Sequence, residues 1–144
     1  MRGEFVRLVV RRAEEVEMTA SLASKRRMIS VGDAPWQTYS LQGKPQKDCA
    51  WANLSYDEET GEGCFLFRFG PGARSIAHEH LGYEEFVILE GSIEDHDGAV
   101  YKAGDFVSLK PGSRHWSHSE EGAVVAVFIR GGFRTLANDA EADG

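Results

Sequence analysis

Four of the five histidines fall in two short segments flanked by turn residues: His78 and His80 in the first, His115 and His118 in the second. His78 and His80 are two apart on a predicted strand, and because strand side chains alternate faces, both imidazoles point the same way. His115 follows a Pro-Gly-Ser-Arg turn, which returns its imidazole to that face if the two strands are neighbours. Imidazoles combined with a carboxylate suit a borderline divalent ion such as iron, manganese, nickel, copper or zinc.

The carboxylate has two candidates in the residues themselves. Glu84 and Glu85 both follow a Leu-Gly-Tyr turn after His80. The turn interrupts the strand alternation, so side-chain period alone does not choose between them.

Short strands must position these side chains. From Trp36 onward, apolar or alternating runs are separated by Gly, Pro, Asp and Asn, a pattern typical of an antiparallel all-β domain. Nine strands are predicted, at residues 36–41, 49–56, 63–69, 74–80, 85–90, 92–95, 99–102, 105–109 and 123–130. We expect a barrel over residues 34–134, an N-terminal leader over 1–33 that favours helix at 11–28, and a flexible acidic tail over 135–144.

Composition sets limits on partners and location. The 144 residues suit a single core, and the net charge of −7 argues against a nucleic-acid partner, which requires clustered Lys and Arg. Cys49 and Cys64 lack the CxxC spacing of a zinc ribbon and do not form a disulfide framework. No apolar run approaches the length of a membrane span or a signal sequence, so we expect no membrane association and a cytoplasmic location.

The histidine segments carry a further pattern, in which the sequence resembles the cupin family. The first cupin motif, G-x5-H-x-H-x3,4-E-x6-G, is matched at every specified position, by Gly72, His78, His80, Glu84 and Gly91. The second motif, G-x5-P-x-G-x2-H-x3-N, is matched by Gly104, Gly112 and His115, with Lys110 in place of proline and Ser119 in place of asparagine. The resemblance implies a small double-stranded β-helix (jelly-roll) barrel. It also selects Glu84 over Glu85 and implies one divalent ion (Fe, Mn, Zn or Ni) held by His78, His80, Glu84 and His115.

Within the cupins, the run from His78 to Gly91 is similar to the cupin domain of ChrR-type anti-sigma factors and to acetylacetone-cleaving dioxygenases. The anti-sigma members carry an additional helical zinc domain that this sequence lacks, and the dioxygenases use three histidines without a carboxylate, whereas Glu84 is present here. The resemblance also implies a homodimer.

Three functions follow from these observations. The first is a dioxygenase-like oxidoreductase that binds a small enolisable or acidic compound on the metal. The second is a non-catalytic sensor or regulatory module with a closed zinc site, and the third is a sugar isomerase or epimerase, against which the complete metal motif argues.

Several side chains could contribute to a ligand pocket or support the metal ligands, although aromatic residues at strand spacing are more often plain core. These candidates are Tyr83, Phe86, Phe106, Trp116 and His118. Arg68 and Arg114 could recognise a carboxylate through their guanidinium groups.

Overall fold

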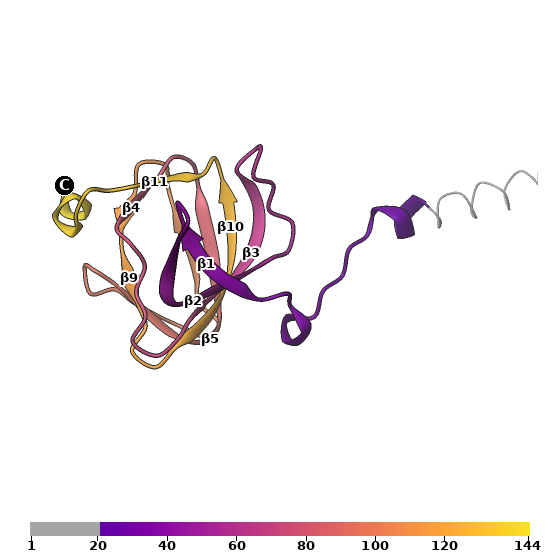
Figure 1. Ribbon diagram of the computed structural model, residues 1–144, viewed down its shortest axis with the longest axis horizontal. Helices are drawn as coiled ribbons and strands as arrows, with labels where there is room; N and C mark the ends of the chain where they lie inside the picture. The colour runs from indigo at the N-terminus through magenta and orange to yellow at the C-terminus, as the bar shows by residue number, and fades with distance from the viewer. Residues whose placement is uncertain (1–20) are drawn as a thin grey trace, which may run out of the picture. The chain divides into compact units, whose positions relative to one another are not determined.

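A computed structural model describes residues 21–144 of the chain (Figure 1), which divides into two compact units after Asp33. In the first unit, residues 21–25 are helical and a short 3-10 helix, η1, spans Val31–Asp33. The part of the predicted leader helix at residues 11–20 lies outside the described residues. Among the helices of residues 21–144, none is long and apolar enough to cross a membrane.

The regular elements of the second unit, which begins at Ala34, are antiparallel strands apart from one short 3-10 helix near the C-terminus. One sheet of eight strands has the order β1-β2-β3-β10-β5-β6, with β7 and β9 also paired to β5, and a sheet of three has the order β11-β4-β8. The larger sheet comprises β1 (Gln37–Leu41), β2 (Lys44–Asn53), β3 (Glu62–Phe69), β5 (Glu84–Asp95), β6 (Val100–Lys102), β7 (Phe106–Leu109), β9 (Ser117–His118) and β10 (Ala123–Arg130). The smaller sheet comprises β4 (His78–His80), β8 (Arg114–His115) and β11 (Phe133–Thr135).

The core follows from side-chain alternation along the central strands. β10 lies between β3 and β5, and its alternate residues Val125, Val127 and Ile129 are buried. Phe86 and Ile88 on β5 are also buried, and they pack in the same cluster as Val125 and Val127. This period of two buries one face of each strand, as the sequence pattern predicted.

Strand β5 differs from the prediction because it runs unbroken through Gly91, where two separate strands were expected. Gly91 has a φ of 73°, and the pairing of β5 with β10 shifts register beside it, between Val124 and Val125. A β-carbon at Gly91 would lie 2.0 Å from the carbonyl oxygen of Gly122. Glycine therefore permits a bend within one strand, so that β5 pairs with β10 and β7 in its first half and with β6 and β9 in its second.

The C-terminal residues, where we expect an acidic tail over 135–144, contain regular structure. In the structure β11 pairs with β4 (Figure 1), and η2 (Asp139–Asp143) begins at the N-cap residue Asn138. Leu136 and Ala142 are buried in a small cluster with Ala77, against which Trp116 packs. Two apolar residues within an otherwise acidic segment thus provide the packing that composition alone did not reveal.

Candidate metal centre

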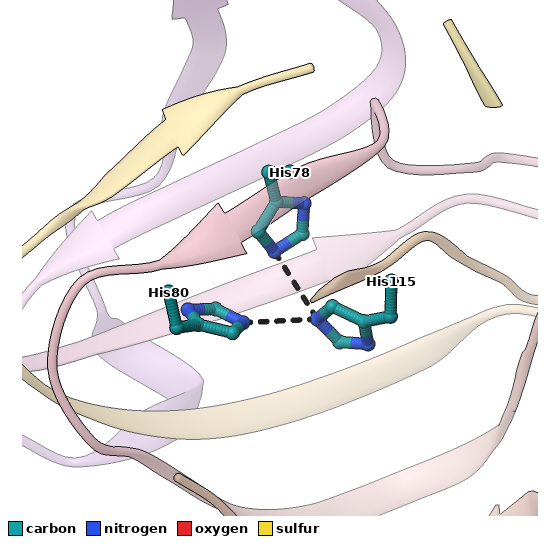
Figure 2. A group of neighbouring side chains, drawn as sticks. All are labelled: His78, His80 and His115. Carbon is teal, nitrogen blue, oxygen red and sulfur yellow. Dashed lines mark hydrogen bonds between the residues drawn. The ribbon is translucent and has the colours of Figure 1, made fainter. Parts of the chain in front are cut away.

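Two strands of the smaller sheet bring three imidazoles together. His78 and His80 lie on β4, and His78 is paired directly with His115 on β8. Figure 2 shows the three rings converging, with the Nε2 atom of His115 3.1 Å from that of His78 and 3.0 Å from that of His80. Glu79, between the two β4 histidines, instead forms ion pairs with Arg114 and Arg134. The alternation predicted for this strand is therefore observed.

Hydrogen bonds on the far side of two rings orient their lone pairs toward the centre. The Nδ1–H of His78 donates to the carbonyl oxygen of Ile76 at 2.6 Å, and the Nδ1–H of His115 donates to Asp95 Oδ1 at 3.0 Å. A neutral imidazole carries only one proton, so both Nε2 atoms are left with lone pairs that face one another. Two facing lone pairs repel, and a cation between them removes the repulsion.

The donor set fits a divalent ion. Metal–imidazole bonds are about 2.0–2.1 Å long, so two nitrogens on one ion lie within roughly 4.2 Å of each other. Both of the measured Nε2 separations meet this limit. Burial lowers the pKa of His78 to about 4 and that of His80 to about 3, which keeps both imidazoles neutral and available as ligands near neutral pH. The three histidines could therefore hold a metal ion.

Asp95 supports this group, although sequence reasoning assigned it no role. Its buried carboxylate accepts hydrogen bonds from His115, from Ser117 Oγ and, at 2.8 Å, from the Tyr101 hydroxyl. Burial alone would raise the pKa of Asp95. The hydrogen bonds from His115, Ser117 and Tyr101 lower it by more, so the net shift is downward and the carboxyl stays ionised. Burial lowers the pKa of His115, yet its bond to Asp95 outweighs that effect and the net shift is upward. The signal in the sequence was strand period, because Asp95 follows the buried Ile93 by two residues.

The two candidate glutamates at the start of β5 face opposite ways. Glu84 lines an internal cavity together with His78 and His115, and its Oε2 lies 3.4 Å from Nδ1 of His80. Glu85 is instead paired with Arg130 at 2.6 Å. Burial raises the pKa of Glu84 to about 7, so its carboxylate lies in an environment that favours a nearby cation.

The raised pKa of Glu84 predicts how pH affects the metal-free protein. Between pH 4.5, the ordinary value, and about 7, the unfolded chain releases this proton while the folded chain retains it, so stability falls as pH rises. Glu84→Gln removes this loss. We compare the free energies of unfolding of the two metal-free proteins. The variant's value minus the wild type's value should rise by on the order of 2 kcal/mol between about pH 5 and pH 8.

Urea denaturation at the two pH values measures this difference. Glu85→Gln is the matched control and should show no such pH-dependent gain, because its carboxylate is paired with Arg130 outside the cavity. A difference between Glu84→Gln and wild type that does not change with pH would contradict the assigned environment of Glu84.

A cavity of about 100 Å³ lies beside the histidines and is lined by residues of both sheets. His78, His115 and Glu84 form its polar part, and the rest is mainly apolar. His80 is fully buried behind them, with its side chain 0% exposed. A metal held by this group would therefore face the cavity.

Of the five weaker pocket candidates, the structure places only Phe86 in the lining of this cavity. Phe106 is 59% exposed, because its strand turns it to the outside of the sheet. Tyr83 lies under the guanidinium group of Arg130, 5.0 Å from ring centroid to Cζ. Trp116 packs against the buried cluster of Ala77, Leu136 and Ala142. The Nε2 atom of His118 lies 3.8 Å from Oε2 of Glu94. These four candidate side chains do not line this cavity.

Comparison with known proteins identifies the family. The profile of the ChrR cupin-like domain matches residues 24–132. The chain belongs to this cupin family. The match spans both histidine segments and the strands that position them, which confirms the predicted resemblance and the small all-β cupin fold. No curated protein matches the chain by sequence.

Solved structures show the same cupin fold. An acetylacetone dioxygenase from Acinetobacter johnsonii superposes with a TM-score of 0.67 at 15% identity, over 77% of this chain and 78% of that chain. An RmlC-like cupin protein from Ralstonia eutropha JMP134 gives a TM-score of 0.65 at 21% identity, over 76% and 71%. The Rhodobacter sphaeroides complex of SigE with the anti-sigma ChrR gives 0.57 at 20% identity, over 69% of this chain but 50% of that chain.

Proposed function

We propose that this cupin is a metal-dependent, dioxygenase-like oxidoreductase that acts on a small enolisable compound. The ion would be held by His78, His80 and His115, with Glu84 as a fourth ligand, and iron, manganese, zinc and nickel all suit these donors. One observation carries the proposal: His78, His115 and Glu84 line a cavity, so a ligand in that cavity can reach the ion. A purely structural site would have no need of such access.

The protein's own residues would prepare the site for this chemistry. A bound redox-active ion would supply Lewis acidity toward substrate oxygen atoms and electron exchange with dioxygen. Asp95 and the Ile76 carbonyl hold the Nδ1 protons of His115 and His78, which fixes the direction of both rings. The apolar wall limits water in the cavity, which strengthens electrostatic interactions with the substrate.

The proposed reaction balances without a separate reductant. Dioxygen is the oxidant, a carbon–carbon bond of the substrate breaks, and one oxygen atom enters each of the two carbonyl products. The enolisable proton would pass to solvent and return on the acidic product, and the electron-rich enolate would present two oxygen atoms toward an ion held by His78, His80 and His115.

Oxygen uptake by the iron-loaded protein tests this function. We expect a 1,3-diketone to consume one equivalent of dioxygen per molecule, and we expect zinc-loaded protein to consume none. Absence of uptake by protein that contains iron, across a panel of neutral diketones and hydroxy acids, would contradict the proposal. Oxygen uptake that survives chelation of the iron would also contradict a metal-dependent reaction.

The family match favours a second candidate, a non-catalytic regulatory module. The matching profile is named for ChrR, and a solved structure contains that anti-sigma protein in complex with SigE. In this alternative the site holds zinc in a closed four-coordinate arrangement and the domain docks with a protein partner. Ligand exchange at the ion separates the two functions, because a closed site admits no added ligand.

The homodimer also remains a prediction, which light scattering would contradict by showing a monomer.

A further inference from the structure

Charged side chains join the three strands of the smaller sheet on the face opposite the histidines. Glu79 lies between His78 and His80 on β4, so strand alternation turns its carboxylate to that opposite face. Arg114 on β8 and Arg134 on β11 are both paired directly with Glu79 in the strand register. One carboxylate thus links the strand that carries two histidines to a neighbour on each side.

The hydrogen bonds of Glu79 are charged and partly shielded from water. Its Oε1 accepts from Nε of Arg114 at 3.0 Å, and its Oε2 accepts from Nε of Arg134. The side chain of Glu79 is only 15% exposed. Arg114 also donates from Nη1 to the carbonyl oxygen of Glu141 in η2, at 3.4 Å. Charged bonds with this shielding are stronger than exposed ion pairs, so they contribute to holding the sheet together.

The strands of this sheet are too short to fix their register firmly by backbone pairing alone. β4 and β11 have three residues each and β8 has two, so the ladder between them contains few hydrogen bonds. A slip of one residue would turn every side chain of a strand to the other face. Such a slip would carry the imidazoles away from one another. A link between the strands on the opposite face opposes it.

The same register sets both the metal ligands and part of the cavity wall. His78 is paired with His115 on one side and with Thr135 on the other, and His80 is paired with Phe133. The rings of His78 and Phe133 lie 5.4 Å apart, and both Phe133 and Thr135 line the cavity. The C-terminal segment, residues 133–143, therefore packs directly beside the strand that carries two of the three histidines.

We propose that Glu79 is a positioning residue for the metal centre, because through Arg114 and Arg134 it holds β4, β8 and β11 in the register that brings the three imidazoles together. The inference rests on the metal site of the proposed function and is independent of the reaction at that site. Since Arg134 belongs to the C-terminal segment, docking of this segment and metal binding are coupled. The coupling is reciprocal, so a bound ion also stabilises the docked segment.

Zinc affinity of the full-length chain, measured by competition with a chromophoric chelator at neutral pH, tests this role. We expect Glu79→Gln to bind zinc roughly 10-fold more weakly than the wild type, because an uncharged amide forms neither ion pair. Glu85→Gln is the matched control, because it breaks the pair with Arg130 in the larger sheet and should keep the wild-type affinity. Wild-type zinc affinity in Glu79→Gln would overturn the inference.

The exposed partner provides a second variant that should fold. Arg134 is 53% exposed, and Arg134→Gln should weaken zinc binding less than Glu79→Gln does, because the pair of Glu79 with Arg114 remains. In the double variant, Arg134→Gln should add no further loss to that of Glu79→Gln. Fully additive losses would show that the two side chains act independently, and would contradict a shared link.

Hydrogen exchange separates positioning from a general effect on stability. The amide N–H of Leu136 donates to the carbonyl oxygen of Ala77 at 2.9 Å, so its exchange reports the docking of the C-terminal segment. We expect saturating zinc to slow this exchange in the wild type and to slow it much less in Glu79→Gln. A loss of stability alone would speed exchange in the variant and leave the factor due to zinc unchanged, and that result would overturn the coupling.

The outcomes distinguish this inference from the proposed function. A wild type that binds no zinc would sink the metal centre and this inference together. Zinc binding that is the same in the wild type and in Glu79→Gln would sink only the role of Glu79 and leave the proposed function standing.

Discussion

Replacing His80 with Ala should remove nearly all bound metal. The imidazole of His80 is fully buried, and its Nε2 lies 3.0 Å from that of His115, so no water can easily take its place. Loss of a residue that merely supports a ligand typically weakens metal binding by about 10–100-fold, and we expect loss of this ligand to weaken it by at least 100-fold. Elemental analysis after dialysis against buffered metal measures the effect.

His96→Ala is the matched control for this variant. His96 is also a largely buried histidine, but it is paired with Asp143 at 3.3 Å and lies outside the group of three. We expect it to retain the metal of the wild type. Equal loss of metal in both variants, or full metal content in folded His80→Ala, would show that the site lies elsewhere.

The second large effect is expected from Asp95→Asn. The carboxylate now accepts the Nδ1 proton of His115, whereas an amide group in its place can donate instead and shift that proton to Nε2. The Nε2 lone pair that faces His78 and His80 would then be lost. We expect metal affinity to fall by about 10–100-fold, and nitrogen NMR of His115 should show the changed tautomer.

Asp97→Asn distinguishes this role from a general effect of charge. Asp97 lies two residues away and accepts a hydrogen bond from the backbone N–H of Ala99 at 3.1 Å, so Asp97→Asn should bind metal like the wild type. Full metal affinity in Asp95→Asn would mean that the His115 tautomer does not depend on this carboxylate.

The sequence predicted the arrangement of the three histidines, because here residue type and strand period agree. His78 and His80 share a face because they are two apart on β4, and the turn before His115 does return it to them through the pairing of β8 with β4. The choice between Glu84 and Glu85 came only from the cupin motif, because the turn after His80 breaks the alternation. Asp95 was missed because a single acidic residue near a hairpin turn usually faces solvent, whereas here its carboxylate is buried and bonded to His115, Ser117 and Tyr101.

The fold was predictable in its class but less so in its boundaries. Strands β8, β9 and β11 are two or three residues long, and such short segments carry no detectable period. The break expected at Gly91 follows from reading glycine as a turn, whereas tertiary pairing with β10 holds the strand together. Phe106 was assigned to the pocket by residue type, and its pairing with Val87 places it on the outer face instead.

X-ray absorption of the iron-loaded protein tests the central claim most directly. We predict three imidazole nitrogens at about 2.0–2.2 Å, contributed by His78, His80 and His115, together with carboxylate and exchangeable water oxygens that bring the total to five or six. Addition of a 1,3-diketone should replace the water oxygens and leave the imidazole count unchanged. A spectrum without imidazole scattering, or a closed four-coordinate ion that does not respond to the diketone, would contradict an open metal centre in this cavity.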